Sequence, residues 1–338
     1  MAKVDVITTA CGPHTSLSRL MESLRTQALE GVRVYAAIPQ IDEPLRVARE
    51  YAAQLGDRMV IVEVPEHTDV ATARNRALDA RATHEPAEFT AFLDDVDWVE
   101  SKHFSSMVEA ADIYHADLVV CGMGCFDGRI GREVCQVGVP GPEGPVIDLT
   151  KFDELAYVNP IVTSKLFRTT CLEGLRFERG PVQVGDLCYF FGAVPKLSMV
   201  LYTNEVTCHH QTSEEAPFGA APMGDNAHVA MRDTLRGIYE RYVADDACAS
   251  FVDHLEAQIF ARLAMGGAGG AATWKNVRTS PSYVRSVRAY LDGTMPDWQK
   301  NRFLGFGTVR YHNKEHLALK SVALMYRWGR MRKKSWQR

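Results

Sequence analysis

Residues 88–99 read EFTAFLDDVDWV, an apolar run followed by three closely spaced aspartates. The apolar and aromatic residues of 88–93 predict a buried strand. Further strand-like runs alternate with helical patterns along the first 120 residues. The expected strands are residues 4–8, 32–38, 59–64 and 117–122, and the expected helices are residues 16–27, 45–55, 70–82 and 101–114. This alternation predicts an α/β fold, Rossmann-like, with a mostly parallel central sheet.

The alternation stops after residue 123. Residues 126–150 are rich in glycine and proline and predict turns with a short hairpin. The polar stretch 211–226 is typical of a linker or a flap. Beyond it, residues 227–265 and 280–291 predict helices. We therefore expect one α/β domain over residues 1–220 and a helical C-terminal region over residues 221–338.

The overall composition is that of an ordinary globular protein. The chain of 338 residues carries 38 Lys and Arg against 42 Asp and Glu, and 46% of its residues are hydrophobic. These values argue against disorder and against a generally basic nucleic-acid binder. The charge is uneven, however, because residues 310–338 hold nine Lys and Arg but only one acid, Glu315. Residues 316–338 predict a basic amphipathic helix that either lies on an anionic membrane or packs on the protein.

Neither end of the chain nor its cysteines indicate secretion. The start, MAKVDVITTACG, shows no secretory signal pattern, and no run approaches the roughly 18 apolar residues of a spanning helix. Eight cysteines are scattered without C-x-x-C pairs, which favours reduced thiols. We expect a cytoplasmic protein, with any membrane contact peripheral and at the inner face of the cell membrane.

The three aspartates are the first candidates for chemistry. Asp94, Asp95 and Asp97 follow a strand directly and so lie at its carboxyl end, where α/β sheets bind ligands. Carboxylates packed this closely repel one another unless a cation compensates, and Mg²⁺ or Mn²⁺ prefers such oxygens. The alternative is a solvated acidic turn that precedes the helix at 101–114. The three residues alone do not decide between these readings.

Five motifs in register resemble those of family 2 glycosyltransferases with the GT-A fold. They are VDVITTACG (4–12), ATARNRALD (71–79), FLDDVDWV (92–99), SKLFR (164–168) and FERGPVQVGDLCYF (177–190). The resemblance covers about residues 3–213. It implies a GT-A catalytic domain that binds a nucleotide sugar, and a divalent cation, Mn²⁺ or Mg²⁺, as cofactor.

The resemblance also implies roles for individual residues. Asp186 would be the general base that takes the acceptor's hydroxyl proton in an inverting transfer. The other implied residues are Thr9, Ala10, Arg74, Asp94 and Asp95 for the donor, Asp95, Asp97 and His210 for the metal, and Lys165 for the acceptor or phosphates. From the residues alone, Asp186 is better explained as the cap of a helix that starts near it, a role compatible with that of a base. A histidine pair at 209–210 without a second ligand pair argues against zinc.

Two positions depart from the family pattern. Aligned on FLD and WV, the usual metal-binding aspartate is replaced by Val96, and the residue before Asp186 is Gly185 rather than an acid. Either the backbone is adjusted so that Asp95 and Asp97 act as a shifted D-x-D pair, or metal dependence is weakened. We favour the first.

The favoured function is an inverting glycosyltransferase that moves a sugar, expected to come from a UDP-sugar, to a hydroxyl of a cell-surface glycan or lipid-linked acceptor. One alternative is a nucleotidyltransferase that makes a sugar nucleotide, but TTACGPHTS (8–16) lacks the basic residues of a triphosphate loop. The other is a catalytically degenerate binding or scaffold protein. Both departures favour that second alternative, and so do residues 36–40, which read AAIPQ where the family usually has an aspartate for the nucleotide.

Overall fold

The computed structural model describes residues 2–11, 17–127, 132–137, 144–212, 225–265, 281–304 and 314–328. The chain divides into two compact units. The first comprises residues 1–149 and 161–215, and the second comprises residues 150–160 and 216–338. This division differs from a single boundary at residue 220, because residues 150–160 belong to the helical unit.

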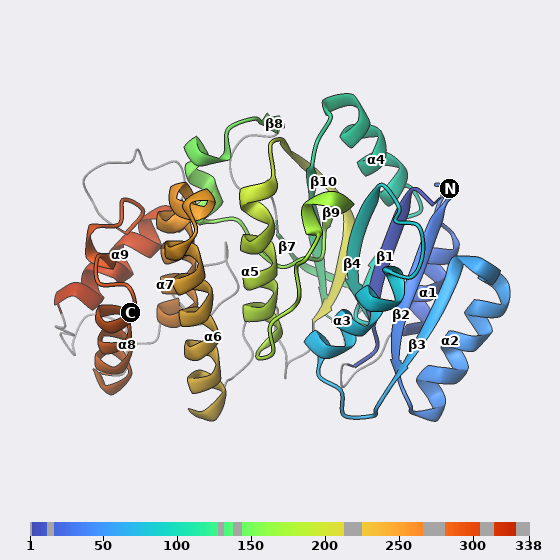
Figure 1. Ribbon diagram of the computed structural model, residues 1–338, viewed down its shortest axis with the longest axis horizontal. Helices are drawn as coiled ribbons and strands as arrows, with labels where there is room; N and C mark the ends of the chain where they lie inside the picture. Colours follow the sequence, from blue (N-terminus) through green and yellow to red (C-terminus); the bar gives the residue numbers. More distant parts are fainter. Residues whose placement is uncertain are drawn as a thin grey trace. The chain divides into compact units, whose positions relative to one another are not determined.

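The first unit is built on one sheet. Its strands are β1 (Val4–Thr9), β2 (Val32–Pro39), β3 (Met59–Val64), β4 (Phe89–Asp94), β5 (Asp97–Val99), β6 (Leu118–Asp127), β7 (Arg132–Val137), β8 (Gly144–Val146), β9 (Lys165–Arg168) and β10 (Val200–Thr212). The order is β3-β2-β1-β4-β9-β6-β10-β5, with β7 beside β6 and β8 beside β10. Figure 1 shows β3, β2, β1 and β4 side by side in that order.

Strand direction sets where the polar residues gather. The pairs β3/β2, β2/β1 and β1/β4 are parallel, as is β6/β10, whereas β9 lies antiparallel between β4 and β6. In this register Thr9 lies beside both Ala37 and Asp94, so β1 and β4 end level with one another, and β2 continues for two more residues to Pro39. The predicted α/β class with a mostly parallel sheet is confirmed, and it brings Thr9 next to the aspartate cluster.

Helices follow the parallel strands as the periodicity predicted. Those of the first unit are α1 (Leu17–Arg25), α2 (Asp42–Leu55), α3 (Val70–Arg81), α4 (His103–Tyr114) and α5 (Val182–Ala193). The short 3₁₀ helices of the chain are η1 (Gly56–Arg58), η2 (Leu149–Lys151), η3 (Asp153–Ala156), η4 (Thr169–Leu172), η5 (Val194–Lys196), η6 (Asp246–Phe251) and η8 (Trp298–Lys300). Asp69 is the N-cap of α3, since its carboxylate accepts a 2.9 Å bond from the Thr72 N–H.

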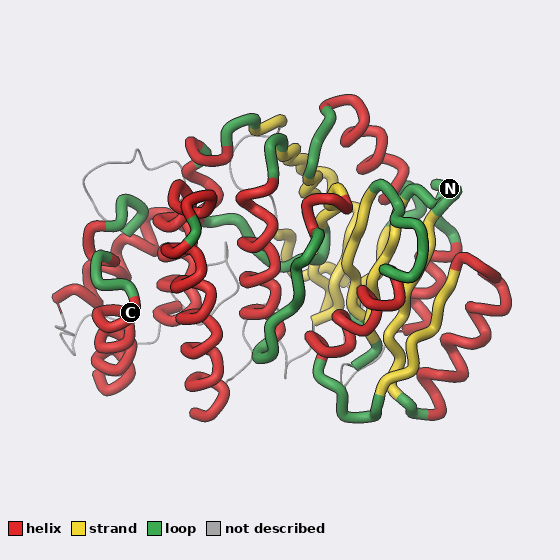
Figure 2. Tube along the Cα trace, in the orientation of Figure 1, coloured by secondary structure: helices red, strands yellow, loops and turns green. Residues whose placement is uncertain are grey.

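The described part of the second unit consists of helices and loops (Figure 2). Its α-helices are α6 (Asp225–Ala244), α7 (Val252–Met265), α8 (Pro281–Thr294) and α9 (Lys314–Trp328). The expected continuous helix over 227–265 is interrupted at Asp245, which caps η6 by accepting a bond from the Ala247 N–H at 3.0 Å. The Gln258 amide of α7 donates to the carbonyls of Ala156 and Val158, at 3.0 and 2.8 Å. These bonds explain why residues 150–160 belong to this unit.

The C-terminal helix α9 packs within the helical unit. Leu319, Val322, Ala323 and Tyr326 are at most 2% exposed, and α9 contacts α7 and α8. These contacts favour the packed alternative for the apolar face of this helix. The most basic part of the tail, residues 329–338, lies outside the described residues. Among the described helices, none is long and apolar enough to cross a membrane.

A buried carboxylate holds the start of the sheet together. Asp5 of β1 is completely buried and accepts bonds from Arg33 at 2.9 Å, from the Ala87 N–H at 3.0 Å and from Arg81 at 3.4 Å.

Truncation of Asp5 would leave the guanidinium groups of Arg33 and Arg81 without this partner in a partly buried place. We expect Asp5→Ala to lower the free energy of unfolding by about 3 kcal/mol, measured by urea denaturation. The matched control is Glu63→Ala, which removes an exposed ion pair with Arg49 and should leave stability nearly unchanged. Equal stability of the two variants would contradict the role given to Asp5.

Candidate functional site

The aspartate cluster lies at the turn between β4 and β5. Asp94 is the last residue of β4 and Asp97 the first of β5, so Asp95 and Val96 form the connecting turn. Side chains alternate in exposure along this segment: Asp94 and Val96 are partly exposed, whereas Asp95 and Asp97 are 3% and 1% exposed. Because Asp95 and Val96 are turn residues, this alternation belongs to the turn and not to an extended strand. It turns Asp95 and Asp97 inward and leaves Asp94 and Val96 toward the accessible side.

Arg74 of α3 links the cluster to the candidate base. Its Nη2 donates to both carboxylate oxygens of Asp94, at 2.9 and 2.8 Å, and its Nη1 donates to Oδ1 of Asp186 at 2.5 Å. The Arg74 side chain is 3% exposed, so both ion pairs lie out of bulk water on the arginine side. A planar guanidinium suits this double pairing because its donors form a rigid fork. The pairs raise the pKa of Arg74 above its ordinary value, so it stays charged.

An aromatic stack and an amide clamp fix the position of Arg74. Its guanidinium lies 4.8 Å from the ring centroid of Phe177, and that ring stacks on Tyr189 at 4.0 Å. The neighbouring Asn75 amide donates to the Phe177 carbonyl and accepts from the Phe177 N–H, both at 2.9 Å. Asparagine is a poor helix former, and here its side chain serves a contact between segments. Phe177 is therefore a support of the site.

Asp186 is buried in α5, and its two oxygens have different partners. Oδ1 accepts from Arg74, and Oδ2 accepts a longer 3.4 Å bond from the Val162 N–H. Burial raises the pKa of Asp186, and the charge of Asp94 adds to this, whereas Arg74 opposes it. The residue lies in the second turn of α5, after the N-cap Pro181, so it is not the helix cap that the sequence alone suggested. With its raised pKa, Asp186 takes up a proton at a higher pH than an ordinary aspartate does.

Asp97 is the second polar centre of the site. Its Oδ2 accepts from the Asp94 N–H at 2.7 Å and from the Thr163 hydroxyl at 3.2 Å, and its Oδ1 lies 2.7 Å from Nδ1 of His210. Antiparallel pairing of β5 with β10 places His210 directly opposite Asp97. The bond to Asp97 raises the pKa of His210 although burial opposes this. Asp97 thus ties the turn to β10 and to residues 161–165.

The remaining predicted residues are placed as follows. Thr9 and Ala10 are buried at the end of β1, where the Ala10 N–H donates to the Ala37 carbonyl at 3.2 Å. Lys165 is 3% exposed, and its ammonium donates to the Ile161 carbonyl at 2.6 Å. Burial lowers the pKa of Lys165 to about 8. Thr9 therefore lies beside the cluster, whereas Lys165 is turned into the protein.

Backbone geometry explains why residue 185 is a glycine. A Cβ at Gly185 would lie 3.1 Å from the Glu178 carbonyl oxygen, closer than ordinary contact. The segment around Glu178 therefore packs directly on α5, and an acid before Asp186 would not fit without movement. Near the same site Ser164 adopts φ +64°, a conformation that costs an L-residue about 1 kcal/mol. Tight packing thus shapes both sides of Asp186.

The predicted metal ligands do not form a metal site in this arrangement. Among the residues that the structure describes, no group of three or more His, Cys, Asp or Glu could hold a metal ion. Both oxygens of Asp97 are bonded within the protein, and Asp95 is buried. Both oxygens of Asp94 accept hydrogen bonds from Arg74. Val96, which cannot ligate, takes the partly exposed position of the turn. The set Asp95, Asp97 and His210 does not fit a divalent cation.

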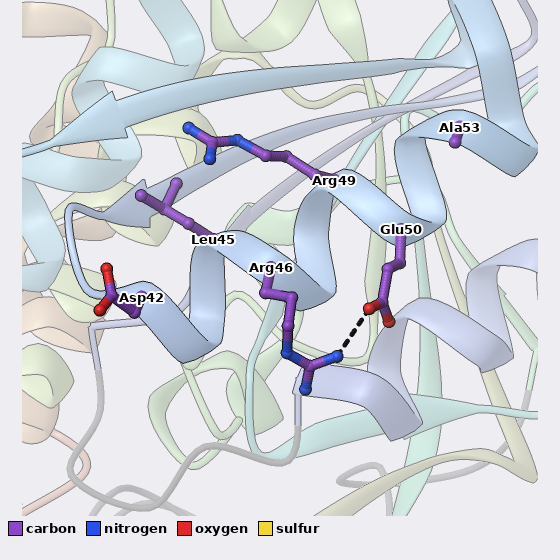
Figure 3. A pocket seen from close by; sticks show the side chains of 6 residues that line it. All are labelled: Asp42, Leu45, Arg46, Arg49, Glu50 and Ala53. Carbon is purple, nitrogen blue, oxygen red and sulfur yellow. Dashed lines mark hydrogen bonds and ion pairs between the residues drawn. The ribbon is translucent and has the colours of Figure 1, made fainter.

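A hollow of about 450 Å³ lies elsewhere on the first unit (Figure 3). All its lining residues belong to α2: Asp42, Leu45, Arg46, Arg49, Glu50 and Ala53. Arg46 and Glu50 form an exposed ion pair across it at 2.6 Å. None of the candidate residues contributes to this hollow, so it is not the candidate site.

Sequence reasoning did not find three contributors. Val162 and Thr163 bond Asp186 and Asp97, and Phe177 carries the Arg74 guanidinium. Val162 bonds Asp186 through its backbone N–H, and such a contact cannot be recognised from the type of residue. Phe177 is the first residue of the motif FERGPVQVGDLCYF, in which the family resemblance implies a role only for Asp186.

The Arg74 pairing predicts a measurable stability loss. In Arg74→Met, Asp94 and Asp186 lose their shared cation in a largely buried place, so we expect the free energy of unfolding to fall by about 3 kcal/mol. The pKa of Asp186 should rise further, since Arg74 opposes the rise. Arg76→Met is the control, because Arg76 is exposed on the same helix. Urea denaturation measures both variants, and equal midpoints would contradict the buried network.

Comparisons with known proteins give a fold and a limited sequence similarity. No protein-family model matches the chain. Over 119 residues the chain is 26% identical to the Bacillus subtilis (strain 168) protein named "Putative glycosyltransferase EpsH", a stretch of 35% of this chain and 33% of that protein. The chain thus matches only a third of the length of this relative.

Among solved structures, S. aureus TarS 1-349 in complex with UDP has a TM-score of 0.64 at 15% identity, covering 97% of this chain and 92% of that one. The same TarS segment with UDP-GlcNAc has a TM-score of 0.62 at 13% identity. Mannosyltransferase PcManGT from Pyrobaculum calidifontis, solved with GDP-Man and Mn²⁺, reaches 0.46 at 14% identity, covering 97% of this chain and 88% of that one. The chain has the fold of TarS 1-349, in agreement with the GT-A fold that its motifs predicted, and it resembles glycosyltransferases in both sequence and structure.

Proposed function

We propose that this chain is a family 2 glycosyltransferase that moves a sugar, with inversion, from a UDP-sugar to a hydroxyl acceptor. The observation that carries the proposal is the Arg74 bridge, which holds Asp94 and Asp186 together at the carboxyl end of β4. Ligands bind at this edge in α/β sheets. The fold is that of TarS 1-349, which has been solved with UDP and with UDP-GlcNAc.

The donor side of the site follows from exposure. Asp94 is the most accessible carboxylate of the cluster, with its side chain 22% exposed, and it is fixed from behind by Arg74. We propose that Asp94 accepts hydrogen bonds from the hydroxyls of the donor's ribose or sugar, since an ionised carboxylate is a good acceptor. Thr9 and Ala10 end the neighbouring strand and would line the nucleotide from the β1 side.

Asp186 would carry the proton transfer. The acceptor hydroxyl loses its proton to an oxygen of Asp186 while its own oxygen forms a bond to the anomeric carbon of the sugar. The bond between that carbon and the diphosphate oxygen breaks, and UDP leaves with its electron pair. Attack from the face opposite the leaving group inverts the anomeric carbon. One correctly placed carboxylate is sufficient for this chemistry.

The acceptor and its location are less constrained by the described residues. We propose a cell-surface glycan or lipid-linked acceptor, which the family resemblance of the sequence motifs implies. The basic residues 329–338 are suited to contact with an anionic membrane surface. The described part of α9 would not take part through its buried face. Lys165 is too buried to reach an acceptor in this arrangement.

A nucleotide-sugar binding protein without transferase activity is the second candidate. Both oxygens of Asp186 already have partners, Arg74 and the Val162 N–H, and the residue is 3% exposed. A base in this state must exchange a partner for the acceptor hydroxyl. The two candidates share donor binding and differ in turnover.

Removal of the base separates these candidates. Asp186→Asn keeps the size of the side chain but cannot take the proton, so we expect kcat to fall by roughly 10²–10⁴-fold with donor affinity retained. The measurement is release of UDP from a panel of UDP-sugars, with and without acceptor extracts. Asp79→Asn, at an exposed ion pair with Arg176, is the control and should keep full activity. If the unmodified protein binds UDP but releases none from any donor, the binding candidate holds instead.

The acid limb of the pH profile should report Asp186. The base works only when deprotonated, and its raised pKa places the loss of kcat/KM at a higher pH than the ordinary value of about 4 for aspartate. Asp94→Asn removes a charge that raises this pKa, so the acid limb should move to lower pH. The control Asp79→Asn should leave the limb in place. An unchanged limb in Asp94→Asn would contradict Asp186 as the titrating group.

A further inference from the structure

The aspartate turn has one partly exposed position without a ligand atom. Along Asp94, Asp95, Val96 and Asp97 the side chains alternate, and Val96 shares the accessible side with Asp94. The turn is held in this register from both ends, by the Asp94 N–H bond to Asp97 and by the Gln211 N–H bond to the Val96 carbonyl at 2.9 Å. A shift by one residue, which would bring Asp95 and Asp97 outward, would break both bonds.

Two of the three carboxylates that could bind a cation, Asp94 and Asp97, already have partners within the protein. Asp97 has three partners from three segments, which are the Asp94 N–H, the Thr163 hydroxyl and His210. Asp94 receives both of its bonds from one nitrogen of Arg74. Asp95 is 3% exposed. A divalent cation needs several open oxygen ligands, and entry here would break existing hydrogen bonds in a buried site.

The positive charge that this cluster needs comes from the chain itself. Arg74 lies between Asp94 and Asp186, fixed on the Phe177 ring, and its guanidinium does not depend on any ligand to stay in place. Within the aspartate cluster, Asp94 therefore has its positive partner in the protein, and the same guanidinium also pairs with Asp186.

We propose that this site binds its nucleotide without a protein-held divalent cation, because Val96 fills the ligand position of the turn, Arg74 holds Asp94, and Asp97 is bonded within the protein. The proposal rests on the proposed function for its nucleotide, but its statement about metal binding stands on the geometry alone. It also places metal binding under the control of one side chain. Val96→Asp would add a carboxylate on the accessible side, next to Asp94.

The first experiment uses the metal alone. Mn²⁺ is titrated into the full chain, its Val96→Asp variant and its Val96→Asn variant, and bound metal is followed by isothermal titration calorimetry and electron paramagnetic resonance. We expect no saturable binding to the unmodified chain, and binding of one Mn²⁺ to Val96→Asp at least about tenfold tighter than to Val96→Asn, since a charged oxygen is the better ligand. Thermal unfolding checks that the variants are folded.

Two results overturn the proposal in this arm. The first is one tightly bound Mn²⁺ in the unmodified chain that is lost in Asp97→Asn. The second is a folded Val96→Asp that gains no Mn²⁺, which would show that Val96 does not occupy a ligand position. Neither result depends on any donor.

The second experiment uses UDP. We expect its affinity for the unmodified chain to change by less than about twofold between EDTA and Mn²⁺, and that of Val96→Asp to rise at least about tenfold with Mn²⁺. A tenfold loss in EDTA for the unmodified chain overturns the proposal. If UDP binds under neither condition, the UDP donor of the proposed function fails, while the Mn²⁺ titration still decides the metal question.

Discussion

The pairing of one guanidinium with two carboxylates is the constraint on which this site depends. Arg74, Asp94 and Asp186 come from α3, β4 and α5, and each would be costly to bury alone. Together they satisfy one another, and the Phe177 ring and the Asn75 clamp leave Arg74 little freedom. The pairing therefore aligns three elements and also presents two acids at one sheet edge.

Asp97 performs a comparable function on the other side of the turn. Through Thr163 and His210 it joins the β4–β5 turn to the segment before β9 and to β10, so the inner side of the cluster is fully engaged. Acidic residues that look alike in the sequence thus divide into two kinds. Asp97 supports the turn from within, whereas Asp94 is held at the accessible side. The letters D-D-V-D do not distinguish these roles, which follow from the hydrogen bonds of Asp97 and the exposure of Asp94 in the folded turn.

Much of the first unit could be predicted from the sequence because its signals are local. Runs of β-branched residues gave the parallel strands, and Asp69 gave a helix start. The pairing of Arg74 with Asp186 joins residues 112 positions apart and depends on the packing of α3 against α5. Val96 at the accessible position follows from the fold of the turn, whereas the D-x-D pattern favoured Asp95 and Asp97. Residues 150–160 carry no compositional boundary, so their place in the second unit could not be foreseen.

Residues 150–160, which interrupt the first unit in the sequence, make the second unit relevant to any shortened form of the chain. Residues 150–160 are bonded by Gln258 of α7, and the chain continues from them directly into Val162 and Thr163, which contact Asp186 and Asp97. A chain that ends near residue 220 would keep every candidate residue. It would lose the Gln258 amide, which donates hydrogen bonds to the carbonyls of Ala156 and Val158. The helical part is thus more than an appendage that can be removed without consequence. Its α7 bonds Ala156 and Val158, which lie a few residues before Val162 and Thr163 in the chain.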